Sequence, residues 1–182
     1  VLLSAWVTQN IYEAVPHLED EVAYVWQARL AADLRLAIPS PPRAEDFLVL
    51  EPGQYRDDSM PGLRLRDLNG TAQAPITIMG DPTKARPVLQ GRGDVNTVRF
   101  GNSSYIVLRY LEVDSLNLGG DGVRNDGVAH HITLEDLVIK GVGPDQSTVG
   151  ISTNGGVAWN WVIRRCVIDG AGTGLYLGNS PG

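Results

Sequence analysis

Hydrophobic and polar residues alternate along three eleven-residue stretches in the second half of the chain, 105–115, 131–141 and 160–170. The stretches are versions of one another and begin 26 and 29 residues apart. Their period of two and their β-branched residues are typical of strands and not of helices. A repeat of roughly 20–50 residues is typical of a solenoid, in which each unit stacks on the next.

The alternation slips by one residue in the middle of each stretch, at Tyr110, Asp136 and Arg165. It then resumes, so each repeat is predicted to form two short strands joined by a bend. A third short strand is predicted between repeats. Four segments supply it: 98–102, 122–125, 150–154 and 174–179.

Three strands per coil predict an all-β, right-handed parallel β-helix over residues 47–182. Equivalent positions of successive coils then stack about 4.8 Å apart. No coil can bury its apolar side alone, so stacking builds a continuous core. The first inward columns are predicted to hold Ile106, Leu108, Ile132, Leu134, Trp161 and Ile163. Because the pattern is unbroken at Gly182, we expect further coils beyond it.

Residues 1–46 do not follow the repeat and are treated as a separate segment. Within it, 19–36 places apolar residues near one helical face and acidic residues in the first turn, and prolines follow from Pro39. This pattern predicts a helix, which we interpret as a cap on the N-terminal end of the solenoid. The apolar residues 1–7 are too few to span a bilayer, so no membrane span is expected in this segment.

The overall charge of −6 and the pI of about 5.0 argue against nucleic acid as a partner, because a phosphate backbone needs a basic face. The chain has one cysteine, Cys166, which is predicted to be a buried small apolar residue. His130 and His131 are adjacent and are therefore predicted to face opposite sides of a strand. Oligomeric state is not indicated by the sequence.

One outward column of the repeat holds charged residues of alternating sign, Arg109, Glu135 and Arg164. One interpretation is ion pairing on a solvated surface. The other is the floor of a sugar-binding groove, because guanidinium groups match carboxylates. Trp159 is the aromatic candidate for stacking on a sugar, since Trp161 falls in an inward column.

Three oxygen-bearing residues follow a pair of glycines, Asp121, Asn125 and Asp126. They are candidate ligands for Ca²⁺, which prefers oxygen donors. The alternative is a solvated turn, because Gly, Asn and Asp are turn formers. Calcium is the only cofactor that the sequence brings into consideration.

A family resemblance is carried by three segments: Glu51-Pro-Gly-Gln-Tyr55, Asn69-Gly-Thr-Ala-Gln-Ala-Pro-Ile-Thr-Ile78 and Ser104-Tyr-Ile-Val-Leu-Arg-Tyr-Leu-Glu-Val113. They resemble pectate-lyase-like right-handed parallel β-helix proteins of the alginate lyase and chondroitinase B type, over about residues 47–182. The resemblance implies a secreted protein, extracellular or periplasmic in a bacterial-type envelope, that acts on an anionic, uronate-containing polysaccharide.

Lysine and arginine do the proton transfer in the resembling lyases, and calcium often neutralises the substrate carboxylate. No residue here matches that lysine and arginine pair, so the catalytic residues are unknown and enzymatic activity stays open. The alternative function is a non-catalytic structural or carbohydrate-binding solenoid module of a surface or extracellular assembly. Fold alone does not decide between these, since one fold hosts many functions.

A second resemblance concerns residues about 4–47. The segment 16–36, followed by prolines, resembles the first extracytoplasmic loop of membrane lipid-linked glycosyltransferases of the arabinose and mannosyl transferase type. In that family an acidic pair serves the sugar-transfer site, and Asp20 and Glu21 are the matching positions. The many spanning helices of that family are absent here, so either this resemblance is accidental or the chain joins segments of different origin.

Overall fold

The computed structural model describes residues 47–56, 63–93 and 95–178. All regular structure in these residues is β. The strands are β1 (Phe47–Leu50), β2 (Gln54–Tyr55), β3 (Leu63–Arg66), β4 (Ile76–Gly80), β5 (Val88–Gln90), β6 (Val98–Gly101), β7 (Ser103–Arg109), β8 (Glu112–Asp114), β9 (Val123–Asn125), β10 (Val128–Glu135), β11 (Val138–Gly143), β12 (Val149–Ser152), β13 (Val157–Trp159), β14 (Val162–Arg164), β15 (Val167–Ala171) and β16 (Thr173–Tyr176). The predicted helix and cap at 19–36 lie outside the described residues.

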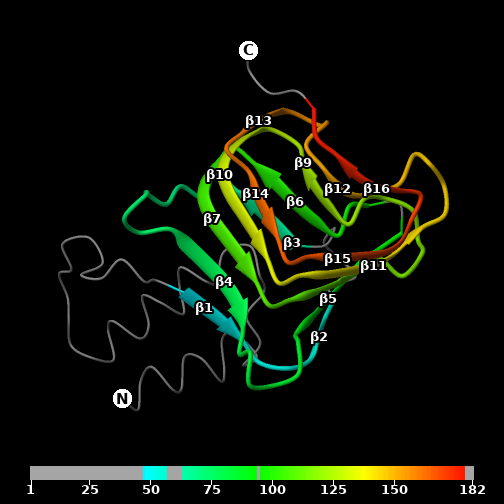
Figure 1. Cartoon of the computed structure of the whole chain (residues 1–182), viewed down its shortest axis with the longest axis horizontal. Helices are drawn as coiled ribbons and strands as arrows, with labels where there is room; N and C mark the ends of the chain where they lie inside the picture. Colours follow the sequence, from blue (N-terminus) through cyan, green and yellow to red (C-terminus); the bar gives the residue numbers. More distant parts are fainter. Residues whose placement is uncertain (1–46, 57–62, 94, 179–182) are drawn as a thin grey trace, which may run out of the picture. The chain divides into compact units, whose positions relative to one another are not determined.

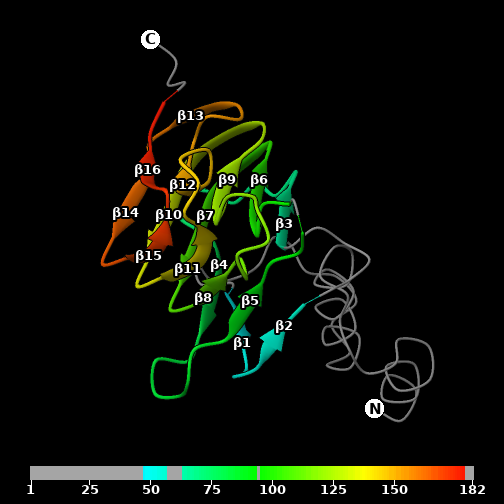
Figure 2. The same ribbon diagram turned by 90° about the vertical axis from the view of Figure 1, so that its right-hand side faces the viewer.

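Three parallel sheets enclose one interior (Figure 1). Sheet A has the order β1-β4-β7-β10-β13, with β14 also pairing with β10. Sheet B has the order β2-β5-β8-β11-β15, and sheet C the order β3-β6-β9-β12-β16. Each coil thus contributes one strand to each sheet, except that the last described coil contributes both β13 and β14 to sheet A. In Figure 2 the colours advance from cyan to red along the stack. The predicted parallel solenoid with three-strand coils is confirmed.

The register confirms the alignment of the repeats. Ile132 pairs with Ile106, and Ile106 pairs with Ile76 one coil earlier. Glu135 pairs with Arg109 on one side and with Arg164 on the other, so these three residues do share one outward column. Stacking of like positions therefore follows from the sequence repeat.

The core consists of the inward columns. Its largest fully buried side chains include Phe100, Ile106, Leu108, Ile132 and Leu134. In the last described coil, the corresponding residues are only half-buried, because no described strand stacks on them. These residues are Trp161, Ile163, Cys166 and Ile168.

Cys166 corrects one expectation, since its side chain is half-buried and not fully enclosed. Its position in the last described coil is the reason. The thiol contacts the carbonyl oxygens of Leu134 and Arg164, at 3.5 and 3.4 Å. Partial burial raises the pKa of Cys166, so the thiolate is disfavoured.

The bends between sheets A and B lie where the alternation slips. Tyr110, Asp136 and Arg165 have left-handed backbone conformations, with φ of 53°, 51° and 53°. This conformation turns the chain without an inserted loop, which is why each bend needs one residue. The bend prediction is confirmed.

A second left-handed series within sheet A was not predicted. Tyr105, His131 and Asn160 have φ of 53°, 53° and 54°. Such a residue breaks the alternation of side chains along a strand. The prediction that His130 and His131 face opposite sides is therefore wrong: their Nδ1 atoms lie 2.8 Å apart.

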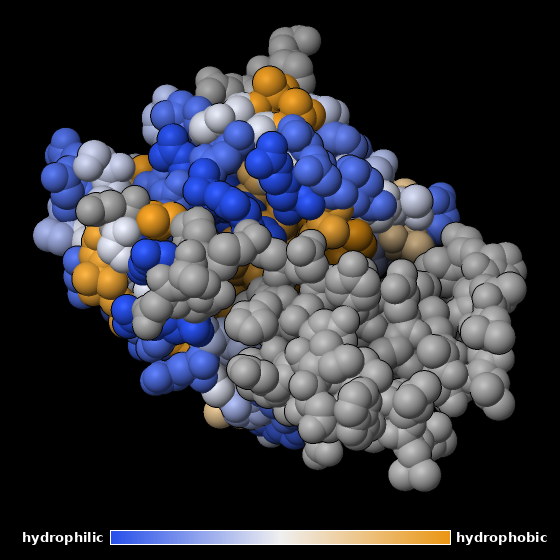
Figure 3. Space-filling view, turned by 180° about the vertical axis from the view of Figure 1, so that it is seen from behind, coloured by the Kyte–Doolittle hydropathy of each residue, from blue (hydrophilic) through white to orange (hydrophobic). Residues whose placement is uncertain are grey.

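One face of the described part of the chain is mainly hydrophilic. Figure 3, seen from behind the view of Figure 1, shows a broad band of hydrophilic residues with a few hydrophobic ones between them. No helix with the length and apolarity needed to cross a bilayer occurs in residues 47–56, 63–93 and 95–178.

Candidate functional site

Three strands of sheet C each carry an arginine at the same outward position. On β3 and β6, Arg64 and Arg99 stand between inward residues that are buried, and Arg124 does so on β9. Arg64 pairs in register with Arg99, and Arg99 with Arg124. We call these three residues the arginine ladder; neighbouring rungs are about 4.8 Å apart along the stack.

The same column continues beyond the ladder. Ser152 pairs with Arg124, and Tyr176 pairs with Ser152. Ser152 is buried, whereas Tyr176 is 48% exposed. The column therefore runs from three guanidinium groups to an exposed aromatic ring.

Two carboxylates contact Arg99 and Arg124, the second and third arginines of the ladder. Asp126 contacts the Nε of Arg99 through Oδ2 and the Nε of Arg124 through Oδ1, the latter at 3.2 Å. Asp121 accepts a hydrogen bond from Arg124 at 2.8 Å. Like charges directly opposite one another destabilise a sheet, and these contacts offset part of that repulsion.

A hollow of about 140 Å³ opens beside the ladder. Arg64, Arg66, Arg99, Asn102 and Asp126 are among the residues that line it. Guanidinium groups present donors in a planar fork that fits carboxylate, sulfate or phosphate oxygens. The volume suits one such anionic group, with the rest of a larger ligand lying outside.

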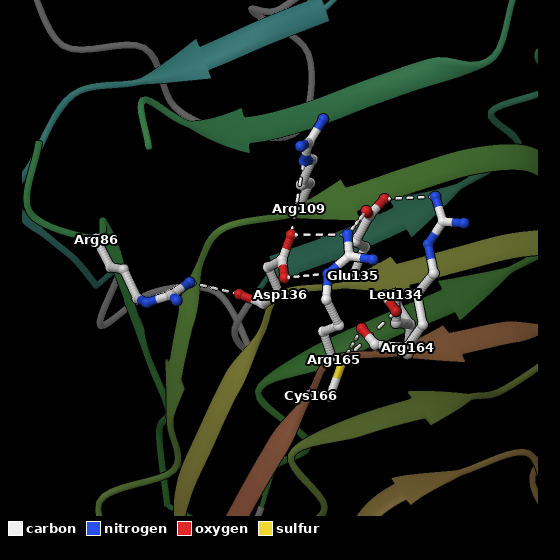
Figure 4. Close-up of polar contacts among 8 residues, drawn as sticks. All are labelled: Arg86, Arg109, Leu134, Glu135, Asp136, Arg164, Arg165 and Cys166. Atoms are coloured by element: carbon white, nitrogen blue, oxygen red, sulfur yellow. Dashed lines mark hydrogen bonds and ion pairs between the residues drawn. The ribbon is translucent and has the colours of Figure 1, made fainter. Parts of the chain in front are cut away.

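The predicted sugar-binding column lies on sheet A (Figure 4). The Glu135 side chain is only 8% exposed and accepts hydrogen bonds from Arg164, at 2.8 Å, and from Arg165. Arg109 lies near Asp136, at 3.8 Å, and no contact between Arg109 and Glu135 is observed. The structure therefore brings Glu135 and Arg164 together and gives Arg109 a different carboxylate.

The bend beside that column is a network of its own. Arg165 donates to Asp136 at 2.7 Å, and Arg86 donates to the backbone oxygen of Asp136. The Arg86 guanidinium also lies over the Tyr110 ring, 3.9 Å from its centroid. These contacts join the successive bends at Tyr110, Asp136 and Arg165, so their role is structural.

Trp159 lies on sheet A and not beside the arginine ladder. Its ring stacks on His130, with centroids 4.2 Å apart and planes 21° from parallel. Trp161 is inward as predicted, and its Nε1 donates to the Ala129 oxygen at 3.0 Å. Trp161 also contacts Phe100 edge to face in the interior.

The structure does not bring the oxygen atoms of the three candidate calcium ligands together around one point. Asp121 accepts from the Val149 backbone as well as from Arg124, at 2.8 Å each. Asn125 is fully buried and bonds to the backbone of Gly127 and Val157. Among the described residues no group of three or more His, Cys, Asp or Glu could hold a metal ion. This arrangement does not favour calcium, and calcium binding stays a prediction.

The arginine ladder was missed in the sequence, although its signal is present. Leu63-Arg64-Leu65, Val98-Arg99-Phe100 and Val123-Arg124-Asn125 share a central arginine. Two of the predicted third strands, 98–102 and 122–125, end in asparagine, and aligning them at Asn102 and Asn125 does not place the arginines in one column. In the structure Asn125 pairs with Phe100, so Asn102 and Asn125 belong to different columns.

No family model matches the chain, and comparisons with curated proteins and with solved structures give no match either. The resemblance to pectate-lyase-like proteins is thus supported by the parallel β-solenoid alone. The resemblance to a glycosyltransferase loop concerns residues outside the described part and stays a prediction.

Proposed function

We propose that this domain binds an anionic, uronate-containing polysaccharide on the outer face of sheet C. The observation that carries the proposal is the arginine ladder, three in-register arginines of which Arg64 and Arg99 line a hollow of about 140 Å³. Arginine forks bind carboxylates with two parallel hydrogen bonds. A carboxylated sugar is therefore the ligand class that the ladder fits best.

The repetition of the ladder favours a polymer over a single sugar acid. Its outer rungs, Arg64 and Arg124, are separated by two strand spacings, about 10 Å. A chain with a carboxylate on many of its units can contact more than one rung at once. Linked contacts of this kind raise overall affinity without any new type of interaction.

Binding is better supported than cleavage. A uronate lyase needs a base near the proton next to the carboxylate and a cation that neutralises the carboxylate. The ladder supplies the neutralising part, but arginine stays protonated and is a poor base. The carboxylates beside it, Asp121 and Asp126, are engaged by arginines. Lyase activity is therefore the second candidate function.

The ligand class also carries a proposal about location. Uronate-containing polysaccharides are components of extracellular and envelope material, so we propose an extracellular or periplasmic protein. The solenoid then serves as a rigid surface whose outward columns meet the polymer, as the concave faces of other solenoids meet their ligands.

Binding is tested with polygalacturonate, alginate and chondroitin, with dextran as the neutral polymer. We expect Arg99→Gln and Arg124→Gln to weaken binding of the uronates about tenfold or more, and added salt to weaken it in the unmodified chain. Arg164→Gln is the matched control, since it removes one guanidinium from sheet A. Equal affinity for dextran, or unchanged affinity in both ladder variants, would contradict the proposal.

Cleavage is followed in the same samples through the absorbance of the unsaturated product, with calcium and with chelator. Turnover that requires calcium would favour the lyase candidate. Binding without turnover under both conditions would favour a carbohydrate-binding module.

A further inference from the structure

A second and larger hollow lies on the outer face of sheet A, with a volume of about 620 Å³. Pro75, Tyr105, Val107, His131, Thr133 and Trp161 are among the residues that line it. They come from consecutive coils, so the hollow runs along the stack. Sheet A is a different face of the solenoid from the one that carries the arginine ladder.

The lining of this hollow has no carboxylate, guanidinium or ammonium group. Most of its residues are apolar or aromatic. Its polar groups are few: hydroxyls from Tyr105 and Thr133, the Asn160 amide and the His131 imidazole. A concave apolar surface with a small number of placed polar groups is the usual composition of a small-molecule site.

Two rings in the hollow lie flat against each other. The Tyr105 and His131 rings stack with centroids 4.3 Å apart and planes 16° from parallel. Both residues have left-handed backbone conformations, which turn their side chains out of the strand alternation. One face of each ring is therefore covered by the other, and the stacked pair forms part of the wall of the hollow across neighbouring coils.

Hydrogen bonds fix the orientation of the His131 ring. The amide nitrogen Nδ2 of Asn160 lies 3.0 Å from Nε2 of His131, and because this nitrogen can only donate, Nε2 is the acceptor. The neutral His131 ring therefore carries its proton on Nδ1, which donates to Nδ1 of His130 at 2.8 Å. His130 in turn stacks on Trp159. The chain of contacts holds the ring in place before any ligand arrives.

We propose that this hollow binds a neutral stretch of glycan, one or more uncharged pyranose rings. A pyranose has flat faces of C–H groups and edges of hydroxyls. The apolar side chains of the lining, Pro75, Val107 and Val162 among them, suit a C–H face, and the polar groups of Thr133 and Asn160 suit the hydroxyls. The lining has no arginine or lysine to pair with a carboxylate, which separates this ligand from that of the arginine ladder.

The test uses the whole chain and a panel of neutral trisaccharides of glucose, mannose, galactose and xylose. Binding is followed by saturation-transfer NMR and by tryptophan fluorescence, because Trp161 lines the hollow. We expect saturable binding of at least one trisaccharide. Tyr105→Ala should weaken it about tenfold, whereas Tyr105→Phe, which keeps the ring, should stay within about threefold.

A second variant covers the case in which Tyr105→Ala does not fold. Val162 lines the hollow and is 45% exposed, so Val162→Arg should fold and should abolish binding by placing a bulky charge in the hollow. Arg99→Gln on sheet C should leave trisaccharide binding unchanged. The proposal is overturned if no trisaccharide binds, if folded Tyr105→Ala and Val162→Arg both bind normally, or if Arg99→Gln abolishes binding as they do.

Discussion

Arg99 and Arg124 are register partners on neighbouring strands, and their guanidinium groups contact opposite oxygens of one carboxylate, that of Asp126. Asp126 follows β9 directly, so the loop that ends the strand also supplies the group that holds two rungs together. The carboxylate offsets the repulsion between the arginines and competes with any anionic ligand for the same donors. Stability and anion binding are therefore opposed at this residue.

Asp126→Asn should lower the free energy of unfolding and strengthen uronate binding. The side chain is 24% exposed, and its loss leaves two arginines with one charged partner fewer. We expect a loss of about 1–2 kcal/mol, in line with hydrogen bonds to charged groups. Urea unfolding measures the first effect, and titration with polygalacturonate measures the second.

Asp169→Asn is the control for Asp126→Asn, because it makes the same change of charge at an exposed position of sheet B. It should alter stability by less than about 0.5 kcal/mol. Weaker uronate binding by Asp126→Asn would show that the carboxylate itself contacts the ligand, and the opposition described above would be wrong.

Glu135→Gln should destabilise the solenoid without changing uronate binding. The Glu135 side chain is 8% exposed, while those of Arg164 and Arg165 are 54% and 56% exposed. After the substitution, water can therefore solvate in part the two guanidinium groups that lose their charged partner. We expect a loss of about 1–3 kcal/mol by urea unfolding.

The comparison for Glu135→Gln is Arg109→Gln, whose nearest carboxylate oxygen is 3.8 Å away. An exposed pair of this kind contributes roughly 0.2–1 kcal/mol. If Glu135→Gln abolishes polygalacturonate binding while the protein stays folded, the sugar-binding site lies on sheet A, as first hypothesised from the column of alternating charge.

The sequence predicted those parts of the fold that depend on repetition. Ile76, Ile106 and Ile132 stack as the repeat requires, because each must cover the apolar side of its neighbour. The single-residue bends at Tyr110 and Asp136 were visible as slips in an otherwise regular alternation. Burial that recurs at equivalent positions of each coil produces a recurring pattern of apolar residues, and this pattern can be read within each short segment of the sequence.

The candidate sites were harder to predict because their geometry depends on backbone conformation and on exact register. The left-handed residue at His131 reverses the expected direction of one side chain and brings it against His130. Tyr105, the first residue of this series, gives no signal of such a conformation, although His and Asn are enriched in it. The pairing of Arg99 with Arg124 needed the register of sheet C, where the strands are short and the loops differ in length.

Gly150→Ala should destabilise the protein, because the added Cβ would lie 2.5 Å from Cγ2 of Ile168 and 2.7 Å from the Gly174 oxygen. Gly150 lies within β12 of sheet C, against atoms of the coil that follows. Overpacking of a buried position costs about 1–3 kcal/mol. The lowered midpoint of thermal or urea unfolding measures this loss.

Gly174→Ala provides a matched comparison in the same column of the last described coil. A Cβ there meets no atom within 4 Å, so the change should be neutral or slightly stabilising. Equal losses for the two substitutions would mean that the stacked coil does not approach Gly150 as closely as the structure shows.

Stability should fall with decreasing pH in a range set partly by His130. Burial lowers the pKa of His130, and the neighbouring His131 lowers it further, relative to an ordinary value of 6.5. The rings that contact it belong to Tyr105, His131 and Trp159, none of which is negatively charged at neutral pH. The unfolded chain therefore binds a proton at a higher pH than the folded chain does. The stabilising contribution of neutral His130 is complete above about pH 6.5 and is lost as the pH falls through that value toward the lower pKa of the folded state.

Urea unfolding between about pH 5 and 7.5 should give a steeper dependence of the unfolding free energy on pH for the unmodified chain than for His130→Gln, which cannot take up the proton. Both proteins keep the same carboxylates, so the difference between their slopes of unfolding free energy against pH isolates the histidine. Identical slopes would show that neither burial nor His131 controls the charge of His130.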